Sequence, residues 1–523
     1  MLLTAELLLQ YQRCRRRLFL DRYGDLSQKD APNELLLKLR QDKLAHQKTV
    51  LEKHTYHHPQ YPKGNWEAGA KATWELMQQG VDCIYKGVLL ATYSEEITLL
   101  SCPDLLIKEP GNSCLGDWLY VPAQIELGKR PKLEYQIVAT FHAQVLAQVQ
   151  SATPNIAWLL LRRKEVYQVS VAKWMPQMQR SLLECIQILT SSQAPEVFIS
   201  RQKCSLCRWF SHCYSQARSQ QHLSLLPGVT PSRYRELQTL NLVTLESLAN
   251  TNPVELENLH GFDNKVAQQL ILQAQSVVEN RPILILEGQG DKETTGQGEN
   301  DRFIIHPSSY PYGEASYILH PSLTPQIELY FDIEAQPELN LDYMLGVLVV
   351  DRTSKTETFH SLLAEKAEDE ALIWQQFLEL VWRYPQAPIF HFFSYEVDTV
   401  KRLAQIYQTP KEQIQPLLER FVDVYEHITQ TVALPVESYA LKAIARWLGF
   451  EWRDPGANGS QCIYWYDQWL ATGDRTFLDS IQNYNEDDCR ATHHVKDWLE
   501  KFIQDEGLVG TSLTKITSSS GNL

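Results

Sequence analysis

The sequence has no apolar run that approaches the roughly 20 residues needed to span a bilayer. Its start also lacks the layout of a secretory signal, because an apolar stretch precedes the basic Arg13–Arg17 cluster instead of following it. Positive charge is scarce: 49 Lys and Arg stand against 63 Asp and Glu, a net charge of -14 that by itself disfavours a polyanionic partner. We therefore expect a cytoplasmic protein without membrane contacts.

The chain is long enough for two or three domains. Its 523 residues are 44% hydrophobic and 21% charged, as is usual for globular proteins. One helix is expected over 4–23. The pattern predicts an α/β (α+β) multidomain protein with five segments: mixed strands and helices over 1–222, a helical module over 223–284, a flexible Gly-, Gln- and acid-containing linker over 285–325, strands followed by helices over 326–506, and a disordered Ser/Thr/Gly-rich tail over 507–523.

Two fragments near the C-terminus carry closely spaced acidic side chains. Asp332 and Glu334 lie two residues apart in an apolar strand-like run, so both carboxylates point to one face. Tyr484 and Asp488 lie four residues apart in a helical segment, so they also share a face. Three carboxylates and a phenol suit a pair of Mg²⁺ or Mn²⁺ ions and an attacking water. The two fragments together therefore predict a two-metal phosphodiesterase site.

The cysteines give the second signal. Cys204, Cys207 and Cys213 form a C-x2-C-x5-C pattern, and Cys14 lies far away among arginines. A cytoplasmic chain seldom uses cysteines for disulfides, so clustered thiols indicate metal or redox chemistry. Four thiolates suit a [4Fe–4S] cluster and also suit Zn²⁺, and the spacing alone does not separate the two.

Cys14 in the opening segment YQRCRRRLFLD, together with the later cysteine pattern, resembles the RecB-like PD-(D/E)XK nucleases that carry an iron–sulfur cluster. The resemblance covers residues 1–222 and implies a restriction-endonuclease-like fold. It also implies that Cys14, Cys204, Cys207 and Cys213 ligate a [4Fe–4S] cluster, with Zn²⁺ as the alternative.

The catalytic motifs of that family are carried over only in part. His46 matches the histidine of the first motif and Asp104 the metal-binding aspartate of the second. In the third motif Gln124 stands where the family has an acid, and Glu126 stands where it has a lysine. A glutamine is a poor ligand for Mg²⁺, and a glutamate cannot supply the positive charge of the lysine. We therefore expect a degenerate nuclease fold that holds nucleic acid without cleaving it, with Lys129 and Arg130 as candidate phosphate contacts.

The segment over 223–284 resembles helix-hairpin-helix modules in Leu259-His260-Gly261-Phe262. In that motif Gly261 would permit a tight turn whose backbone N–H groups contact a phosphate. A plain helical connector is the alternative.

The segment over 326–506 resembles ribonuclease H-like, DnaQ-type DEDD exonucleases, and within them the YprB-like group. The first motif is Phe331–Glu334, and the second is an aromatic strand that ends at Glu396. Asp398 is a rival for that acid, but it would face elsewhere on a helix. Tyr484 and Asp488 form the third motif in its Tyr-x-x-x-Asp form, which is typical of the DEDDy subclass. Asp423 is assigned a supporting role.

The resemblance implies that Asp332, Glu334, Glu396 and Asp488 hold two Mg²⁺ or Mn²⁺ ions and that Tyr484 orients the attacking water. The leading interpretation is a 3′→5′ exonuclease on single-stranded DNA. One alternative is an RNA exonuclease. Another is a non-catalytic adaptor with both nuclease folds silent, which delivers strands to a helicase or repair partner.

Overall fold

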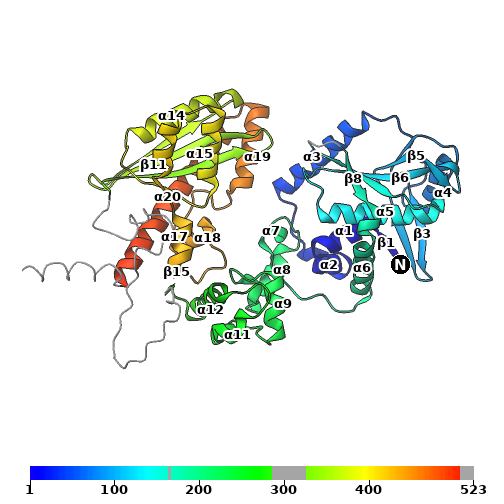
Figure 1. The fold of residues 1–523 in the computed structure, drawn as a ribbon, viewed down its shortest axis with the longest axis horizontal. Helices are drawn as coiled ribbons and strands as arrows, with labels where there is room; N and C mark the ends of the chain where they lie inside the picture. The colour runs from blue at the N-terminus through cyan, green and yellow to red at the C-terminus, as the bar shows by residue number, and fades with distance from the viewer. Residues whose placement is uncertain (163–165, 286–324, 507–523) are drawn as a thin grey trace, which may run out of the picture. The chain divides into compact units, whose positions relative to one another are not determined.

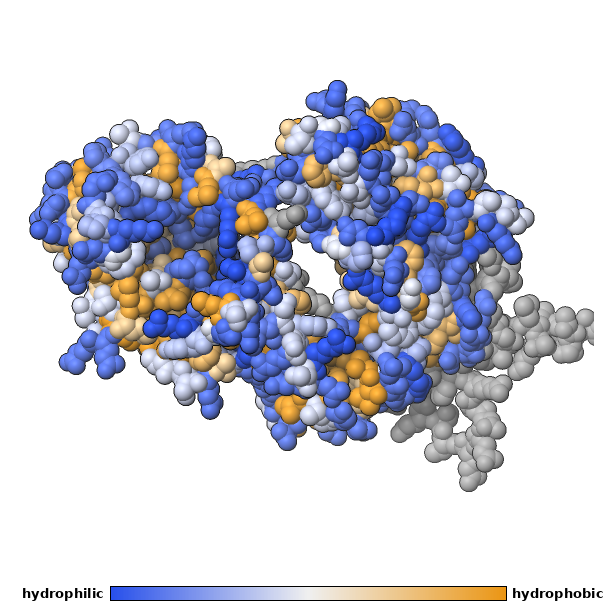
Figure 2. All heavy atoms as spheres, turned by 180° about the vertical axis from the view of Figure 1, so that it is seen from behind, coloured by the Kyte–Doolittle hydropathy of each residue, from blue (hydrophilic) through white to orange (hydrophobic). Residues whose placement is uncertain are grey.

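The computed structural model describes residues 1–162, 166–285 and 325–506. The linker predicted over 285–325 lies, apart from its two end residues, outside the described residues, as does the tail predicted over 507–523. The chain divides into two compact units, Met1–Gln220 and Gln221–Leu523 (Figure 1). Among the described helices, none is both long enough and apolar enough to cross a bilayer. Seen from behind, the surface is mostly hydrophilic with small scattered apolar areas (Figure 2).

The first unit contains two sheets. One has the order β1-β4-β3 and the other the order β2-β5-β6-β7-β8. Helix α5 is almost wholly buried and contacts strands of both sheets, so it forms the centre of this unit. The strands are β1 (Leu2–Thr4), β2 (Cys83–Tyr85), β3 (Leu89–Ser94), β4 (Ile97–Ser101), β5 (Leu105–Ser113), β6 (Gly116–Glu126), β7 (Ile156–Leu161) and β8 (Tyr167–Ser170). The helices are α1 (Ala5–Arg13), α2 (Arg15–Tyr23), α3 (Glu34–Leu51), α4 (Trp66–Gln78), α5 (Leu133–Gln150), α6 (Val171–Thr190), α7 (Arg201–Cys204) and α8 (Phe210–Ser219).

The single helix expected over 4–23 is wrong in one respect, because the helix is interrupted at Cys14. That residue has φ -164° and ψ 119°, and its Sγ accepts a hydrogen bond from the Arg17 N–H as the N-cap of α2. A side chain that satisfies a free helix N–H competes with helix continuation. The break leaves the Cys14 sulfur at the N-terminus of α2.

The second unit is built on a five-stranded sheet with the order β12-β11-β10-β13-β14. Strands β10, β11 and β12 are antiparallel neighbours, whereas β13 and β14 run parallel to β10. The strands are β10 (Ile327–Gln336), β11 (Leu341–Asp351), β12 (Thr356–Leu363), β13 (Ile389–His391) and β14 (Phe421–Asp423). Their helices are α14 (Glu370–Trp382), α15 (Tyr395–Ile406), α16 (Lys411–Leu418), α17 (Val424–Thr431), α18 (Leu441–Trp447), α19 (Gly459–Thr472) and α20 (Thr476–Asp505).

Helices cover both faces of this sheet. The ring of Phe331 lies 4.7 Å from that of Phe377 on α14, and Tyr330, on the opposite face of β10, lies 4.7 Å from His493 on α20. Because side chains alternate along a strand, the even-numbered residues from Glu328 to Glu334 all face α20. These side chains therefore contact residues of the long helix α20.

The helical module is joined to the domain of the five-stranded sheet by backbone and side-chain contacts. Its helices are α9 (Pro231–Thr239), α10 (Leu245–Ala249), α11 (Pro253–Glu257) and α12 (Asn264–Glu279). Strand β9 (Ile283–Leu284) pairs with β15 (Val432–Ala433). Gln273 on α12 donates to the Leu434 carbonyl and accepts from the Tyr439 hydroxyl at 2.7 Å.

Candidate active site

Three carboxylates meet where β10 crosses α20. The oxygens of Asp332, Glu334 and Asp488 lie within 4.8 Å of one another. The two strand residues come from the face of β10 that looks toward α20, and Asp488 comes from the facing turn of that helix. A β-bulge follows directly between Glu334 and Ala335, and such irregularities re-aim side chains beside active sites. The structure thus brings together the two acidic fragments that are separated by about 150 residues of sequence.

Glu396 supplies a fourth carboxylate from the N-terminal turn of α15. It is buried, and its negative charge raises the pKa of both Asp332 and Glu334. Its Oε2 atom is buried without a hydrogen-bond partner and lies 3.6 Å from the His391 Nδ1. Asp398, two residues further along the helix, is exposed to solvent. Glu396 is therefore the α15 acid that faces the cluster.

Burial and mutual repulsion disfavour ionisation of the cluster. Burial raises the pKa of Asp332 and Glu334 well above the usual range, and the Asp488 charge raises both further. Burial also raises the pKa of Asp488 to about 7. Carboxylates that repel each other in a buried site are stabilised by divalent cations, which prefer oxygen ligands. The donor set and its charge therefore fit hard divalent cations such as Mg²⁺ or Mn²⁺.

Tyr484 places its hydroxyl beside the carboxylates, where it hydrogen-bonds to Asp488 one helical turn away. Burial and the neighbouring negative charges raise the pKa of Tyr484 far above 10. The phenol therefore keeps its proton at neutral pH and donates it to Asp488, while its oxygen can accept a hydrogen bond from a water and so position it. The Lys442 ammonium lies 4.9 Å from the centre of the Tyr484 ring, so a positive charge also borders the site.

Two residues hold the carboxylates in place, and a glycine leaves room for one of these two. None of the three was predicted from the sequence. The Asn485 Nδ2 donates to Asp332 at 2.6 Å, and the Trp452 Nε1 donates to Asp488 at 2.7 Å. Gly346 on β11 pairs with Asp332 in the strand register, and a Cβ there would lie 1.6 Å from the Asn485 Oδ1. No spacing in the sequence connects these residues, since β11, the loop before α19 and α20 meet only in the folded chain.

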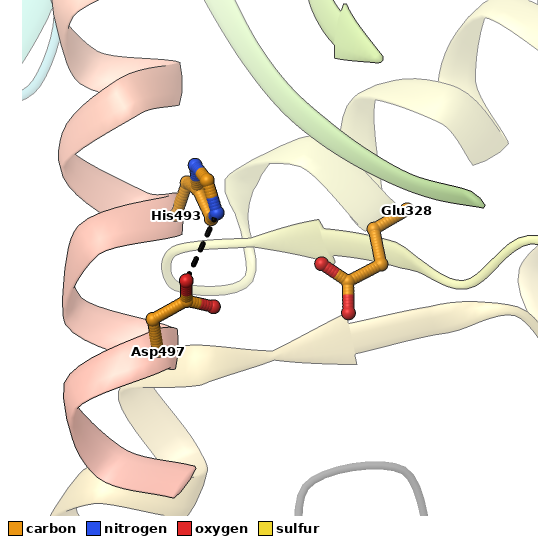
Figure 3. Close-up of side chains that lie close together, drawn as sticks. All are labelled: Glu328, His493 and Asp497. Carbon is orange, nitrogen blue, oxygen red and sulfur yellow. Dashed lines mark ion pairs between the residues drawn. The ribbon is translucent and has the colours of Figure 1, made fainter. Parts of the chain in front are cut away.

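A second polar group lies further along the same strand and helix. Glu328, His493 and Asp497 also bring ligand atoms within 4.8 Å, with Glu328 on β10 and the other two one turn apart on α20 (Figure 3). Here Arg352 and Lys496 already neutralise the acids, each pairing with Glu328, at 2.5 Å and 2.7 Å respectively. We interpret this group as an ion-pair network that anchors α20 to β10.

In the first unit the two acids of the predicted degenerate site are paired with lysines. Lys86 donates to Asp104 at 2.5 Å, and Lys43 on α3 donates to Glu126 at 3.0 Å. The Gln124 amide also donates to Glu126, at 2.7 Å. The His46 Nε2 lies 3.4 Å from the Leu160 carbonyl oxygen. Lysine ammonium groups thus occupy positions beside both acids.

The four predicted cysteine ligands are neighbours in space. The Cys14 thiol raises the pKa of Cys204, Cys207 and Cys213, in addition to the larger effect of burial. Arg16 and Arg17 act in the opposite direction on Cys213 and Cys207. In the described part of the chain, neither tight group of potential single-ion ligands includes a cysteine.

The remaining predicted nucleic-acid contacts are at the surface. Lys129 and Arg130 are exposed in the loop between β6 and α5. Gly261 is exposed with φ +84°, a conformation that favours glycine. Arg233 donates to the carbonyls of both Gly261 and Gly228, at 2.9 Å each, and thereby joins two turns of the helical module.

Comparison with known families places the C-terminal domain in a class. Residues 329–500 match the model of the RNase_H superfamily. That segment runs from β10 through most of α20 and includes all five predicted catalytic residues. The C-terminal domain is therefore RNase H-like, which indicates a nuclease-type enzyme that binds nucleic acid and uses divalent metal ions. The match does not reach residues 1–222, for which the PD-(D/E)XK fold stays a prediction. A comparison with curated proteins gave no match.

Proposed function

We propose that the C-terminal domain is a metal-dependent 3′→5′ exonuclease that acts on single-stranded DNA. The observation that carries the proposal is the convergence of the Asp332, Glu334 and Asp488 oxygens within 4.8 Å, with buried Glu396 beside them. The four carboxylates would hold a pair of Mg²⁺ or Mn²⁺ ions. Bound there, the ions would supply the positive charge and the acidified water that phosphodiester hydrolysis needs.

The side chains around the carboxylates divide the remaining work. Protonated Tyr484 orients a water by hydrogen bonding, because its raised pKa keeps it from acting as a base near neutral pH. Asn485 and Trp452 fix the orientation of Asp332 and Asp488 by donating to one oxygen of each. Lys442 adds a positive charge near the position where a substrate phosphate would lie.

The direct test is to incubate the full-length protein with Mn²⁺ and single-stranded DNA or RNA labelled at the 5′ end. We expect a ladder of progressively shortened labelled DNA, because removal from the 3′ end leaves the label on the polymer. Faster digestion of RNA would change the assigned substrate, and immediate release of labelled mononucleotide would reverse the polarity. Absence of any digestion would contradict the enzyme and favour the adaptor.

The N-terminal unit is proposed to hold nucleic acid without cleaving it. Lys86 and Lys43 pair with Asp104 and Glu126, the two acids of the degenerate site. An ammonium group beside each carboxylate opposes the binding of a divalent cation at the same place. We therefore expect Asp104→Ala to leave hydrolysis unchanged. If Asp104→Ala stops digestion and Asp332→Ala does not, hydrolysis takes place in the N-terminal unit, and the proposed assignment to the C-terminal domain is wrong.

The four cysteines are proposed to bind a [4Fe–4S] cluster. Four thiolates also suit Zn²⁺, which is the alternative. Burial raises the pKa of Cys213 and Cys207, and the charges of Arg16 and Arg17 lower it in part, toward the thiolate form that metal ligation requires.

Anaerobically purified protein is expected to absorb at about 400 nm. Cys207→Ala should abolish the absorption, while Cys114→Ala, which removes an exposed cysteine outside the group, should retain it. Colourless protein with one equivalent of zinc would contradict the cluster.

A further inference from the structure

Phe393 has an unusual backbone conformation next to the carboxylate cluster. Its φ is +83°, in the left-handed region that a non-glycine residue seldom adopts. Two side chains hold it there: the Asp423 Oδ1 accepts its N–H at 2.9 Å, and the His391 Nδ1 lies 2.7 Å from its carbonyl oxygen. Strain of this kind persists only where surrounding contacts impose it, and it is often found at functional sites.

The same contacts tie Phe393 to the cluster. His391 also lies 3.6 Å from the Glu396 Oε2, so one imidazole contacts both the strained residue and the fourth carboxylate. Strands β10 and β13 are parallel, with Tyr330 opposite Phe390. Extending this register places the residues just after β13 level with Asp332 and Ile333 on the neighbouring strand. Phe393 therefore lies just beyond the end of β13, at the level of the carboxylates on β10.

The Phe393 ring is presented to solvent instead of to the core. It is 53% exposed and lies against Tyr425, whose ring is 4.9 Å away in an edge-to-face arrangement. Asp423, the predicted supporting acid, also accepts the Tyr425 N–H at 2.9 Å. One carboxylate thus fixes both the exposed ring and the ring that supports it.

We propose that the exposed face of Phe393 stacks on a base at the unpaired end of the nucleic acid that the carboxylate site hydrolyses. The inference rests on the proposed exonuclease function and adds the residue that holds the terminal base, which must be unpaired because a paired base is already stacked in its duplex. Aromatic side chains stack on every base without a sequence preference. His391 and Asp423 are positioning residues, since they act through the Phe393 backbone.

The test uses a single-stranded DNA that carries 2-aminopurine at its 3′ end, with the full-length protein in the Asp332→Asn background. Binding should quench the fluorescence of the base, and Phe393→Ala should remove the quenching and weaken binding about tenfold. Phe393→Tyr should restore both. With otherwise native protein, Phe393→Ala should raise KM and leave kcat nearly unchanged.

Phe393→Gly separates stacking from folding. Glycine adopts φ +83° without strain, so this variant should unfold at the same temperature as the native protein or higher, yet it should also lose quenching. Unchanged quenching in both Phe393→Ala and Phe393→Gly would overturn the stacking proposal even if hydrolysis is observed. Quenching that depends on Phe393 in a protein without hydrolysis would instead refute the exonuclease and leave the stacking intact.

Discussion

Replacing Asp332 with asparagine should abolish hydrolysis, with a loss in kcat of about a thousandfold or more. Asp332 lies at the centre of the cluster, because the charges of Asp488, Glu334 and Glu396 all act on it. Asparagine keeps the size of the side chain and removes the charge that would bind a cation. The measurement is the rate of 3′-end shortening at saturating Mn²⁺ and single-stranded DNA.

Stability should change in the opposite direction from activity. Because the pKa of Asp332 is raised on folding, the folded protein binds protons more tightly than the unfolded chain, and stability falls as pH rises above the ordinary carboxylate range. Removing this carboxylate relieves that repulsion, so metal-free Asp332→Asn should unfold at an equal or higher temperature near pH 8. The exposed Asp398→Asn is the matched control and should alter neither quantity. If Asp332→Asn is inactive because it no longer folds, then Asp332 has a structural role, and its assignment as a metal ligand is contradicted.

Adding one methyl group at Gly346 should have the second-largest effect. A Cβ there would lie 1.6 Å from the Asn485 Oδ1 and 3.1 Å from the Phe359 ring. Asn485 is fully buried between β11 and α20, so its side chain has no free space to enter. Gly346→Ala should therefore displace Asn485, release Asp332 from its 2.6 Å hydrogen bond, and reduce kcat more than tenfold. We also expect a loss of about 1–3 kcal/mol in the free energy of unfolding, as is typical of overpacking.

A double substitution tests whether Gly346→Ala acts by displacing Asn485. Gly346→Ala combined with Asn485→Ala removes the clash, so stability should largely recover while activity stays low. Gly459→Ala is the matched control, because a Cβ at that glycine has no atom within 4 Å. If Gly346→Ala retains full activity, or if the double variant regains it, Asn485 does not position Asp332.

The approach of Asp332, Glu334 and Asp488 was predictable because strand and helix periodicities place them on common faces, whereas Glu396 was predicted only from the family resemblance. Asp332 and Glu334 share a face of β10, as Tyr484 and Asp488 share a face of α20. The residues that hold them were not predictable. Gly346, Trp452 and Asn485 act through contacts between elements distant in sequence, and a single glycine or tryptophan has no periodic pattern.

The N-terminal unit shows the same difference between pattern and packing. The motif residues Asp104 and Glu126 could be located in the sequence, but their pairing with Lys86 and Lys43 depends on how the loop after β2 and helix α3 pack. The helix break at Cys14 was missed because the sequence there has no glycine or proline that would signal it. The break is visible only in the extended backbone of Cys14 and in the capping hydrogen bond to its sulfur.

The number of Mn²⁺ ions that the protein binds, followed by electron paramagnetic resonance, tests directly whether these carboxylates form a metal site. We expect two bound ions at about pH 8 and weaker binding at about pH 5.5, where Asp488, with its pKa of about 7, holds a proton that competes with the metal. Asp332→Asn should remove this binding, whereas Asp104→Asn should not. Failure to bind Mn²⁺ at the higher pH, or binding unaffected by Asp332→Asn, would contradict a catalytic metal site at this cluster.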